Sequence, residues 1–380
     1  MLNHSSCNIL FIDSVPKDFI NYLQQQGYTV TYDPGLSEDR LTSEITKYNI
    51  LVLSNKTIDK KILDNAKSLS LVIKMGPGRG NIDLDYASSK GIFVCNTPHS
   101  HDDSIAELIV GHLIACDRHI VQNIEHLRHG EWRQKFFLQC DGLTGRTIGI
   151  IGSFCRDRLV EIVQSFKMNI LFAETYEECL SIAPRCDAIS VNVEPFTSEF
   201  ILNDNFFKKM KNGSIFINVT NSSIVDYEAL KNLIDEKDLQ VGLDVYPVES
   251  KATVADFIDT ELAELISSGT SHIGHSTKQS IGKTTDEILN IINDFVLYGK
   301  VKNCLNLHKN ETDVAYIVRH KGILTKILVK LESLGILVKE VNNSLIDSGE
   351  CHCAIIRFEG RENIIEEIRS IDGVIGVGLI

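Results

Sequence analysis

A glycine between a buried strand and a helix is the first place in this sequence where residue types suggest chemistry. The apolar run Thr147–Ile151 has the pattern of a parallel strand, Gly152 follows it at once, and Arg158–Phe166 is compatible with a helix. In that context a dinucleotide pyrophosphate binds at the helix N-terminus. The G-x-G-x-x-G pattern is broken, however, because Phe154 and Asp157 take its second and third glycine positions. The stretch therefore predicts a nucleotide-type fold and gives only a weak signal for nucleotide binding.

A second glycine-rich loop lies earlier, at Met75–Gly80. Its three glycines and one proline leave backbone amides exposed at the carboxyl end of a predicted strand, Ser70–Met75, where α/β sheets bind ligands. Two cations, Lys74 and Arg79, flank this loop. An ordinary turn explains the same residues about equally well, so the loop alone does not establish a ligand site.

The composition narrows the class of protein. At 380 residues the chain is long enough for two or three domains, and 43% apolar with 23% charged residues is ordinary for a soluble globular protein. The net charge of −13 argues against nucleic acid or an anionic membrane as a partner, so an anionic substrate would need a local cationic pocket. No apolar run reaches the roughly eighteen residues of a membrane span, and the N-terminus lacks a signal-peptide layout.

The cysteines indicate a reducing compartment and do not suggest a metal site. Ten are scattered without regular spacing, which indicates reduced thiols in the cytoplasm. Cys351 and Cys353 share one face of a predicted strand on either side of His352, but no second pair of ligands accompanies them. The sequence therefore predicts no metal site.

Two regions alternate strands and helices, which is typical of doubly wound parallel sheets. In the first region the strands are predicted at Asn8–Ile12, Tyr28–Tyr32, Ile50–Ser54, Ser70–Met75 and Ile92–Asn96, with a first helix at Lys17–Gln26. In the second, helices at Asp103–Arg118 and Val121–His129 precede strands at Thr147–Ile151, Ile170–Ala173, Ala188–Val193, Ser214–Val219 and Gln240–Val245. A helix at Thr285–Tyr298 would return the chain to the first domain and make that domain discontinuous.

The C-terminal part has a different pattern. Residues 300–311 have the composition of a polar linker. After them come strands at Val314–Val318, Gly335–Asn342, Cys353–Phe358 and Val374–Leu379 and helices at Gly322–Leu334 and Asn363–Ile371. This βαββαβ order predicts a ferredoxin-like domain.

Several motifs occur in the order in which one enzyme family carries them. They are Asn81-Ile82-Asp83, Asn96-Thr97-Pro98 before Ser104–Leu108, Leu143–Gly145, Ile224–Asp226 with Ala229-Leu230, Leu243–Glu249 and Ser271–Gly274. On these residues the chain resembles the D-2-hydroxyacid dehydrogenase family, and within it the phosphoglycerate dehydrogenases with a C-terminal ACT domain. The likeness covers nearly the whole chain. It implies a flavodoxin-like substrate-binding domain at residues 1–99 and 281–305, a Rossmann NAD-binding domain at 100–280 and an ACT-like domain at 312–380.

The resemblance implies hydride transfer between a 2-hydroxy acid and NAD. His272 takes the family's acid/base position, since an imidazole near pKa 6.5 can both accept and return a proton. Glu249 takes the position of the carboxylate that raises the pKa of this histidine and fixes its tautomer. The family's arginine falls on Asn221, which is neutral and shorter and offers at most one good amide donor. Loss of such a contact typically reduces the rate by about a hundredfold or more.

The cofactor positions are only partly kept. The resemblance assigns cofactor contacts to Gly152, Cys155, Arg156, Glu174, Thr220 and Asp244, with Glu174 at the ribose hydroxyls and Asp244 on the carboxamide side. Departures from the family pattern occur at Asp102, Asp103, Phe154, Asp157, Asn192 and His275. We therefore expect NAD affinity to be weak or absent.

The substrate and effector positions are mixed in the same way. The resemblance assigns substrate contacts to Lys74, Gly78, Arg79, Arg133 and Lys135, the last two following Trp132 in a region that contacts the substrate phosphate in related enzymes. In the ACT-like part, the serine-binding turn of the family corresponds to Ile317–Gly322, which keeps only the glycine, and a ligand asparagine falls on Leu337. Serine feedback is therefore not expected, whereas a homodimer or homotetramer is.

Two hypotheses remain. The first is an NAD-dependent dehydrogenase of the serine-biosynthesis type that works slowly or on an altered substrate. The second is a pseudoenzyme, a non-catalytic regulatory or binding subunit that keeps the dimeric dehydrogenase fold.

Overall fold

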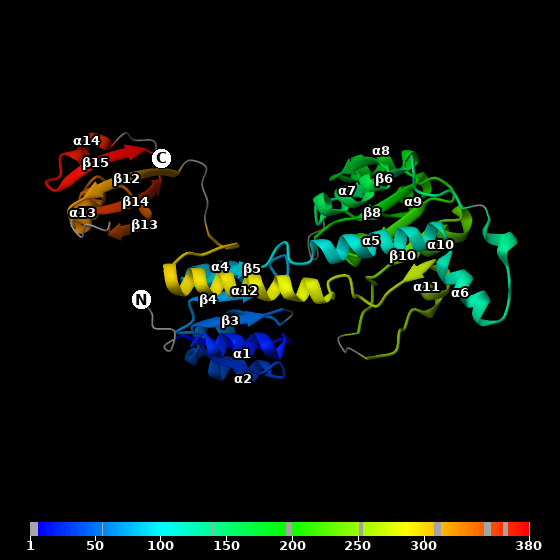
Figure 1. Ribbon diagram of the computed structural model, residues 1–380, viewed down its shortest axis with the longest axis horizontal. Coiled ribbons are helices and arrows are strands. Elements are labelled where there is room, and N and C mark those ends of the chain that lie inside the picture. The colour runs from blue at the N-terminus through cyan, green and yellow to red at the C-terminus, as the bar shows by residue number, and fades with distance from the viewer. Residues whose placement is uncertain are drawn as a thin grey trace. The chain divides into compact units, whose positions relative to one another are not determined.

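The chain forms two compact units, Met1–Asn306 and Leu307–Ile380. The computed structural model describes residues 7–54, 56–138, 140–194, 200–250, 254–307, 313–345, 351–359 and 364–379. The first unit holds two parallel sheets and the second a small antiparallel sheet (Figure 1). Among the helices in these ranges, none combines the length and the apolar character that a membrane span requires.

The first sheet has the strand order β2-β1-β3-β4-β5, and all its neighbouring strands are parallel. Its strands are β1 (Asn8–Phe11), β2 (Thr29–Tyr32), β3 (Ile50–Leu53), β4 (Leu71–Lys74) and β5 (Phe93–Asn96). Every residue of β3 and β4 is buried, as expected for strands covered on both faces. The helices are α1 (Lys17–Gln25), α2 (Glu38–Glu44), α3 (Lys60–Asn65), α4 (Leu84–Ser89) and α12 (Lys278–Tyr298), with a 3₁₀ turn η2 (Ile45–Lys47).

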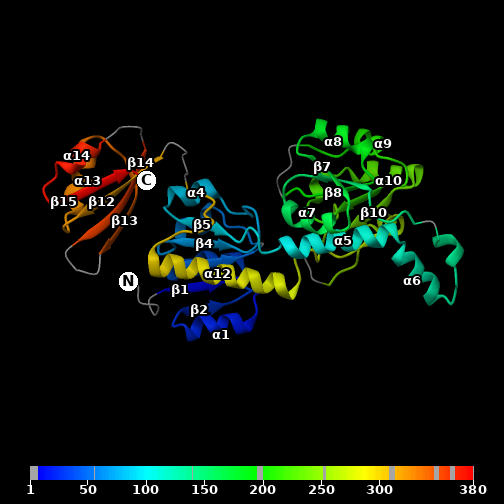
Figure 2. The ribbon, with the colours of Figure 1, turned by 45° about the horizontal axis from the view of Figure 1, so that its top comes forward.

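Helix α12 returns from late in the sequence to cover this first sheet (Figure 2). Its residues Ile288, Ile291, Ile292 and Val296 are buried in one cluster with β1, β3 and β4. The helix begins at Lys278, earlier than the predicted Thr285, because the Thr277 side chain caps it by accepting a hydrogen bond from the Ser280 amide.

The second sheet has the order β11-β10-β9-β8-β6-β7 and is also parallel. Its strands are β6 (Thr147–Ile151), β7 (Asn169–Ala173), β8 (Ala188–Val191), β9 (Ile215–Asn218), β10 (Gln240–Leu243) and β11 (Ser268–Gly269). The chain runs from β6 outward to β7 and then returns to β8 on the other side of β6. The carboxyl ends of β6 and β8 therefore form a topological switch point, the usual ligand position in such sheets.

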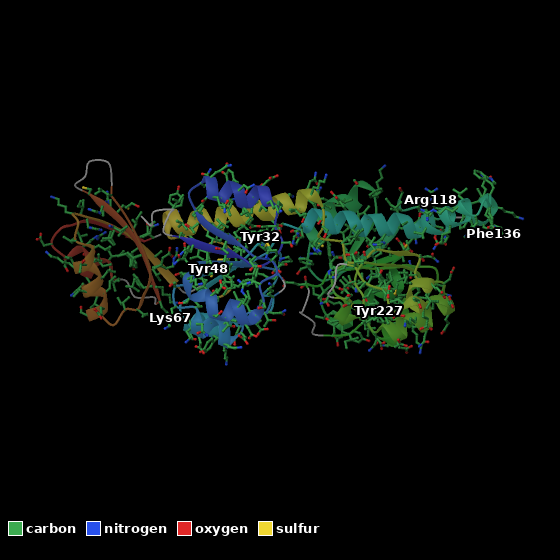
Figure 3. The ribbon with its side chains drawn as sticks, turned by 90° about the horizontal axis from the view of Figure 1, so that it is seen from below. Tyr32, Tyr48, Lys67, Arg118, Phe136 and Tyr227 are labelled. Atoms are coloured by element: carbon green, nitrogen blue, oxygen red, sulfur yellow. The ribbon has the colours of Figure 1, made fainter. Side chains whose placement is uncertain are left out.

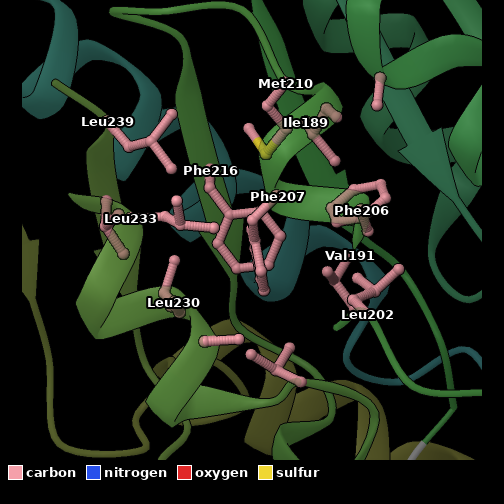
Figure 4. Packing of buried hydrophobic residues seen from close by; sticks show 14 of the residues in the cluster. Ile189, Val191, Leu202, Phe206, Phe207, Met210, Phe216, Leu230, Leu233 and Leu239 are labelled. Atoms are coloured by element: carbon pink, nitrogen blue, oxygen red, sulfur yellow. The ribbon is translucent and has the colours of Figure 1, made fainter. Parts of the chain in front are cut away.

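Helices cover both faces of this second sheet. They are α5 (Asp102–Asp117), α6 (Ile120–Arg128), α7 (Arg156–Ser165), α8 (Tyr176–Ile182), α9 (Asp204–Lys209), α10 (Tyr227–Lys237) and α11 (Thr260–Leu265), with 3₁₀ turns η3 (Gln134–Phe137), η4 (Ala183–Arg185) and η5 (Ser222–Ile224). On one face the rings of Phe206, Phe207 and Phe216 pack edge to face, with centroids 5.2–5.3 Å apart (Figure 4). Such burial of large aromatic side chains fixes the sheet that carries the site.

The second unit has the predicted βαββαβ order. Its elements are β12 (Asp313–His320), α13 (Leu324–Ser333), β13 (Val338–Leu345), β14 (His352–Glu359), α14 (Ile365–Arg369) and β15 (Val374–Leu379). The antiparallel sheet order is β13-β14-β12-β15. Both helices pack on one face, over Tyr316, Ile356 and Phe358. The predicted fold class, two doubly wound sheets followed by a ferredoxin-like unit, is confirmed.

Two boundaries differ from the predictions for local reasons. Helix α7 begins at Arg156 and not at Arg158, because Cys155 adopts a left-handed conformation (φ 48°) and starts the helix directly after the turn. Residues 300–311 are not a simple linker, since the Leu305 amide donates to the Val94 carbonyl of β5 at 2.7 Å. The last residues of that stretch lie outside the described ranges.

Candidate functional site

A histidine–carboxylate pair lies beyond the carboxyl end of β10. His272 Nδ1 and Glu249 Oε2 are 2.6 Å apart. The hydrogen bond with Glu249 raises the pKa of His272, while burial acts in the opposite direction. Burial alone raises the pKa of Glu249, but hydrogen bonds from His272 and the Tyr246 amide outweigh it, so the net shift is downward. Glu249 thus fixes Nδ1 as the donor and leaves Nε2 to exchange a proton with a ligand.

The loop that carries His272 is held by a buried aspartate. Asp244 accepts hydrogen bonds from Thr270 Oγ1 at 2.6 Å and from the Ile273 and Gly274 amides at 2.8 Å each. Its own carbonyl accepts from the His272 amide at 2.9 Å. The loop places His272 at φ 54°, a conformation that needs such support. Asp244, assigned to the cofactor from the sequence, therefore fixes the position of His272.

Asn221 is buried and its side chain is committed to the local backbone. Its Oδ1 accepts from the Ser223 amide at 2.9 Å and hydroxyl at 2.7 Å, which caps η5. Its Nδ2 donates to the Glu194 carbonyl at 3.0 Å. The amide donor that the sequence allowed for substrate is thus directed at main chain.

The glycine loop after β4 is held by polar residues at the carboxyl end of β5. Gly76, Gly78 and Gly80 all have positive φ, and the Gly76 amide donates to Thr97 Oγ1 at 2.7 Å. Asn96 Nδ2 donates to the Gly78 carbonyl at 3.3 Å. These contacts hold the exposed face of the loop in one shape.

The two cations that flank this loop behave differently. Lys74 is buried beneath the loop, where its ammonium donates to the Met75 carbonyl at 2.6 Å. Burial lowers the pKa of Lys74, and the nearby carboxylates of Asp13 and Glu194 oppose that shift. Arg79 is exposed. Lys74 therefore supplies positive potential from below the loop, and Arg79 is the cation on its solvent side.

Glu194 is a residue of this region that the sequence reasoning missed. It follows β8, and its Oε1 lies 3.4 Å from the point where a Cβ on Gly78 would stand. A carboxylate here opposes an incoming anion, since like charges repel strongly at a partly buried site. Only the fold reveals this proximity, because Gly78 follows a strand of the first sheet and Glu194 follows a strand of the second.

Three histidines form a row from Glu249 to the glycine loop, and His101 was also missed. Ring centroids are 5.6 Å apart for His272 and His275 and 5.7 Å apart for His275 and His101. His101 Nε2 lies 2.9 Å from the point where a Cβ on Gly76 would stand. Two histidines directly after Asn96-Thr97-Pro98 were the available signal, but nothing in their spacing separates His101 from His99.

The protonation of His101 follows from its partners. Its Nδ1 lies 2.6 Å from Ser280 Oγ, and that hydroxyl donates its proton to the Ser100 carbonyl at 3.1 Å. Nδ1 must therefore carry the imidazole proton, and Nε2 presents a lone pair. Burial, with His275 and Lys74 adding to it, lowers the pKa of His101 to about 4. At neutral pH this residue is a hydrogen-bond acceptor beside the glycine loop.

The turn after β6 is braced by Asn192. Gly152 has φ 92°, and a Cβ there would lie 2.3 Å from the Asn192 carbonyl oxygen. That oxygen accepts from the Phe154 amide at 2.8 Å, and Asn192 Nδ2 donates to the Phe154 carbonyl at 3.0 Å and to Cys155 Sγ at 3.1 Å. Cys155 is buried, which raises the pKa of its thiol to about 12. The glycine is required by this close approach.

Charges around the N-terminus of α7 are largely paired. No side chain caps the helix, and Asp157 lies in its first turn. Arg156 Nη1 is 2.7 Å from Glu174 Oε1 and its guanidinium lies over the Phe172 ring. The remaining acidic residues are also engaged: Asp103 pairs with Arg158 and Lys283, and Asp102 with His99.

This region has features that suit a dinucleotide, together with charges that oppose one. The glycine turn and the uncapped helix N-terminus offer orphan amides for a pyrophosphate, and Glu174 stands at the end of β7 for a ribose. Asp157 adds negative charge beside the phosphates, and Arg156 already occupies Glu174. Thr220 is buried and donates to the Val191 carbonyl at 3.0 Å, so it supports β8.

Releasing Glu174 should strengthen cofactor binding. In Arg156→Ala the carboxylate loses its internal partner and can accept ribose hydroxyls, so the Kd for NAD⁺ should fall by about three- to tenfold, as for one recovered charge-assisted hydrogen bond. Isothermal titration measures this. Lys208→Ala, which breaks the exposed pair with Asp204, is the matched control. An unchanged or higher Kd in Arg156→Ala would mean that Arg156 itself holds the cofactor.

The other two predicted substrate cations, Arg133 and Lys135, lie far from the glycine loop in the same chain. They follow α6, beyond the C-terminal end of α5, and α5 spans 16 residues, about 24 Å. Figure 3 shows Phe136 at the tip of this projection, past Arg118. Arg133 pairs with Glu131 at 2.9 Å, and both cations are exposed. One chain therefore does not bring the four predicted cations together.

In the C-terminal unit, the turn after β12 is built on histidines. His320 is buried, its Nδ1 accepts from the Ile323 amide at 3.1 Å, and its ring stacks on His352 at 5.3 Å. Burial lowers the pKa of His320. Leu337 is largely exposed. Within the described residues, no group of three or more His, Cys, Asp or Glu side chains is arranged to hold a metal ion.

Comparison with known proteins gives one consistent family. A family profile described as "D-isomer specific 2-hydroxyacid dehydrogenase, catalytic domain" matches residues 9–306. D-3-phosphoglycerate dehydrogenase 2 of Saccharomyces cerevisiae is 28% identical over 327 residues, covering 79% of this chain and 69% of the yeast protein. Hydroxypyruvate reductase of Thermotoga maritima is 30% identical over 284 residues, covering 70% of this chain and 91% of that protein. Human D-3-phosphoglycerate dehydrogenase is 30% identical over 300 residues, covering 74% of this chain and 55% of its own length.

Solved structures show the same fold. The NAD⁺-bound 3-phosphoglycerate dehydrogenase of Entamoeba histolytica matches with a TM-score of 0.64 and 22% identity, covering 80% of this chain and 100% of that chain. D-2-hydroxyisocaproate dehydrogenase matches with a TM-score of 0.70 and 18% identity, covering 79% of this chain and 99% of that chain.

Proposed function

The chain belongs to the D-isomer specific 2-hydroxyacid dehydrogenases, and from that premise we propose that it is an NAD-linked dehydrogenase of the phosphoglycerate type with low turnover and weak cofactor affinity. The observation that carries this proposal is the 2.6 Å contact between His272 Nδ1 and Glu249 Oε2. A non-catalytic subunit has no need for a histidine whose pKa is raised by a paired carboxylate. The serine-biosynthesis role is part of the proposal.

The residues divide the work as follows. In the oxidation direction His272 Nε2 takes the proton of the substrate hydroxyl, and Glu249 stabilises the imidazolium that forms. Bound NAD would accept the hydride. The loop amides beyond Gly76, whose own amide is bound to Thr97, and the charge of Lys74 beneath the loop bind the substrate carboxylate in place of an arginine fork. Residues 1–99 with 281–305 are assigned to the substrate and residues 100–280 to the cofactor.

Thermal-shift titrations with NAD⁺ and NADH test the cofactor. Binding to the native state alone raises its unfolding free energy by about 2.7 kcal/mol at a ligand concentration of 100 Kd. We expect a clear rise in Tm only at millimolar cofactor, because Asp157 and the Arg156–Glu174 pair weaken binding. No shift at any soluble concentration would eliminate the dehydrogenase proposal.

Substrate choice is tested by NADH oxidation with small 2-keto acids. A panel of 3-phosphohydroxypyruvate, hydroxypyruvate and glyoxylate separates a phosphate-binding site from a smaller one. We expect the highest kcat/KM with the phosphorylated acid. A preference for glyoxylate would overturn the phosphoglycerate assignment and leave the family activity intact.

The second candidate is a non-catalytic regulatory subunit. The observation that favours it is Asn221, whose side chain accepts from Ser223 and donates to the Glu194 carbonyl, where the family's arginine would hold the substrate carboxylate. Cofactor binding without turnover of any panel acid would support this alternative. Residues 312–380 are assigned to an ACT-like regulatory role in either case, and the cytoplasm is the proposed compartment.

We propose a homodimer formed through the projection of α6 and η3. Not one residue of α6 is buried, and Trp132, Phe136 and Leu138 are 80%, 74% and 66% exposed. Exposed large apolar side chains on a single projection mark a protein interface. In such a dimer, the projection of one subunit would bring its Arg133 and Lys135 toward the glycine loop of the other subunit. These two cations are too far from the glycine loop of their own chain.

Charge introduced on this projection should separate the subunits. Trp132→Glu with Phe136→Glu places two carboxylates in a buried interface, which should weaken dimerisation by at least about a hundredfold. Light scattering after size exclusion measures the mass. Ile258→Glu is a matched control, since Ile258 is equally exposed outside the projection. A dimer that survives the double substitution would show that subunits meet elsewhere.

A further inference from the structure

A short segment after α12 pairs along the edge of the first sheet. The Leu305 amide donates to the Val94 carbonyl at 2.7 Å, and the Asn96 amide donates to the Asn303 carbonyl at 3.2 Å. The Asn306 side chain continues the pairing, accepting from the Val94 amide at 2.9 Å and donating to the Ile92 carbonyl at 2.8 Å. The segment therefore covers the open edge of β5, which lies at the end of the sheet order.

This pairing brings two cysteines face to face. Cys95 and Cys304 form an antiparallel bridge, and the hydrogen bonds that define it come from the residues on either side of each cysteine. Such a non-hydrogen-bonded pair has Cα atoms about 4.5 Å apart and closely approaching Cβ atoms. Disulfides accept Cα separations of about 4.4–6.8 Å. Cys304 lies close enough to Cys95 to raise the pKa of the Cys95 thiol.

We propose that Cys95 and Cys304 are a modification site, at which a small disulfide such as oxidised glutathione converts the two thiols into a reversible intramolecular disulfide. Cys304 is partly exposed and reacts first: its thiolate attacks one sulfur of the small disulfide, forms a mixed disulfide and releases one thiolate. Cys95 then loses its proton to solvent and attacks the Cys304 sulfur, which releases the second thiolate. Two protein thiols are oxidised, one small disulfide is reduced to two thiols, and the two protons end on them.

The surroundings of Cys95 and Cys304 determine how fast the disulfide forms and which cysteine pairs with Cys304. Cys95 is buried, so only an oxidant already joined to Cys304 reaches it. The neighbouring Cys304 thiol and burial both raise the pKa of Cys95, so the second step is slow at neutral pH and faster as pH rises. Cys304 Sγ also donates to Asn306 Oδ1 at 3.2 Å, which holds it towards the strand. These contacts select Cys95 as its partner.

The bond would act on the residues that shape the glycine loop. Cys95 directly precedes Asn96 and Thr97, which bind the Gly78 carbonyl and the Gly76 amide. A disulfide would tie this strand end to Cys304 and constrain the long intervening chain in the unfolded state. Oxidation should therefore stabilise the first unit and leave its fold unchanged.

Peptide mapping of the full chain after incubation with oxidised and reduced glutathione tests the proposal. We expect a cross-link between the tryptic peptides 91–118 and 303–309, with fragmentation assigning it to Cys95 and not to Cys116 of the same peptide. Tm should rise by about 5 °C and return after reduction. Cys304→Ser, whose hydroxyl can keep the contact to Asn306, should abolish both effects. Cys140→Ser is the matched control, since Cys140 is equally half-buried.

Several outcomes would overturn the proposed Cys95–Cys304 disulfide. Glutathione attached to Cys304 with Cys95 still reduced would show that the second step does not occur. A cross-link to Cys116, or a Tm rise that survives in Cys304→Ser, would place the oxidation elsewhere. Because the mapping is done first on the unaltered chain, a variant that fails to fold does not remove the test.

Discussion

Replacing His272 with alanine should lower turnover by about 10²- to 10⁴-fold and leave cofactor binding in place. General acid–base catalysis contributes this much, and no other described side chain holds a carboxylate-paired imidazole at the same position. The measurement is kcat for NADH-dependent reduction beside a thermal-shift titration of the same variant. Retained cofactor binding with lost turnover separates a chemical role from misfolding.

The pH profiles of oxidation and reduction should show that Glu249 raises the pKa of His272. Because Glu249 raises the pKa of His272, hydroxy-acid oxidation, which needs neutral His272, rises as pH passes upward through that raised pKa. Reduction needs protonated His272 and falls over the same interval. In Glu249→Gln the pKa returns toward its ordinary value, so both profiles should move to lower pH.

A matched control and a contrary result are available. His275→Ala removes the neighbouring imidazole and should change kcat far less, because His275 has a lowered pKa and no carboxylate partner in the contacts described. If Glu249→Gln leaves the pH profiles in place, the titrating group is not His272. Equal losses in His272→Ala and His275→Ala would also contradict the assignment.

Restoring an arginine at position 221 should raise turnover by about a hundredfold or more, but only when Glu194 is also changed. A guanidinium there would meet a substrate carboxylate bidentately and stabilise charge in the transition state. Glu194 lies close to the same loop, as its distance to Gly78 shows, and would capture the new cation. The expected order of kcat/KM is therefore Asn221→Arg with Glu194→Gln first, and Asn221→Arg alone close to the unaltered chain.

The planar pair of donors in the arginine guanidinium provides a control for the Asn221→Arg experiment. Asn221→Lys with Glu194→Gln adds the same charge without a planar pair of donors and should recover much less activity. Thermal unfolding of each variant guards against the loss of the cap on η5, which depends on Asn221 Oδ1. Equal gains with lysine and arginine would show that charge alone was missing. No gain in any variant would favour the non-catalytic candidate.

The sequence predicted the framework well for a physical reason. The strands of both parallel sheets are short apolar runs between polar turns, and burial on both faces makes that pattern visible without knowledge of partners. His272 and Glu249 were paired in the prediction only through their motifs, and in the structure His272 Nδ1 and Glu249 Oε2 lie 2.6 Å apart. Helix ends were less predictable, because Thr277 and Cys155 set them by local capping and conformation.

The state of the site could not be predicted in the same way. The sequence assigned Asn221, Arg156 and Lys74 to ligands, but in the structure each side chain contacts a protein group that tertiary packing brings to it. His101 and Glu194 reach the glycine loop from other elements, and no spacing in the sequence relates them to it. A single sequence therefore identifies the polar side chains of a site better than it identifies the protein groups that already pair with them.

The brace that Asn192 places on the turn after β6 has a consequence for binding entropy. The backbone carbonyl of Asn192 accepts from the Phe154 amide, and the Asn192 side-chain amide donates to the Phe154 carbonyl and to Cys155 Sγ, so the turn is already ordered without ligand. A dinucleotide would then lose little affinity to the ordering of this loop. Slow hydrogen exchange at the Phe154 amide in the ligand-free protein would reveal such order. Weak cofactor affinity would in that case originate from electrostatic repulsion and pairing, and charge substitutions alone could correct it.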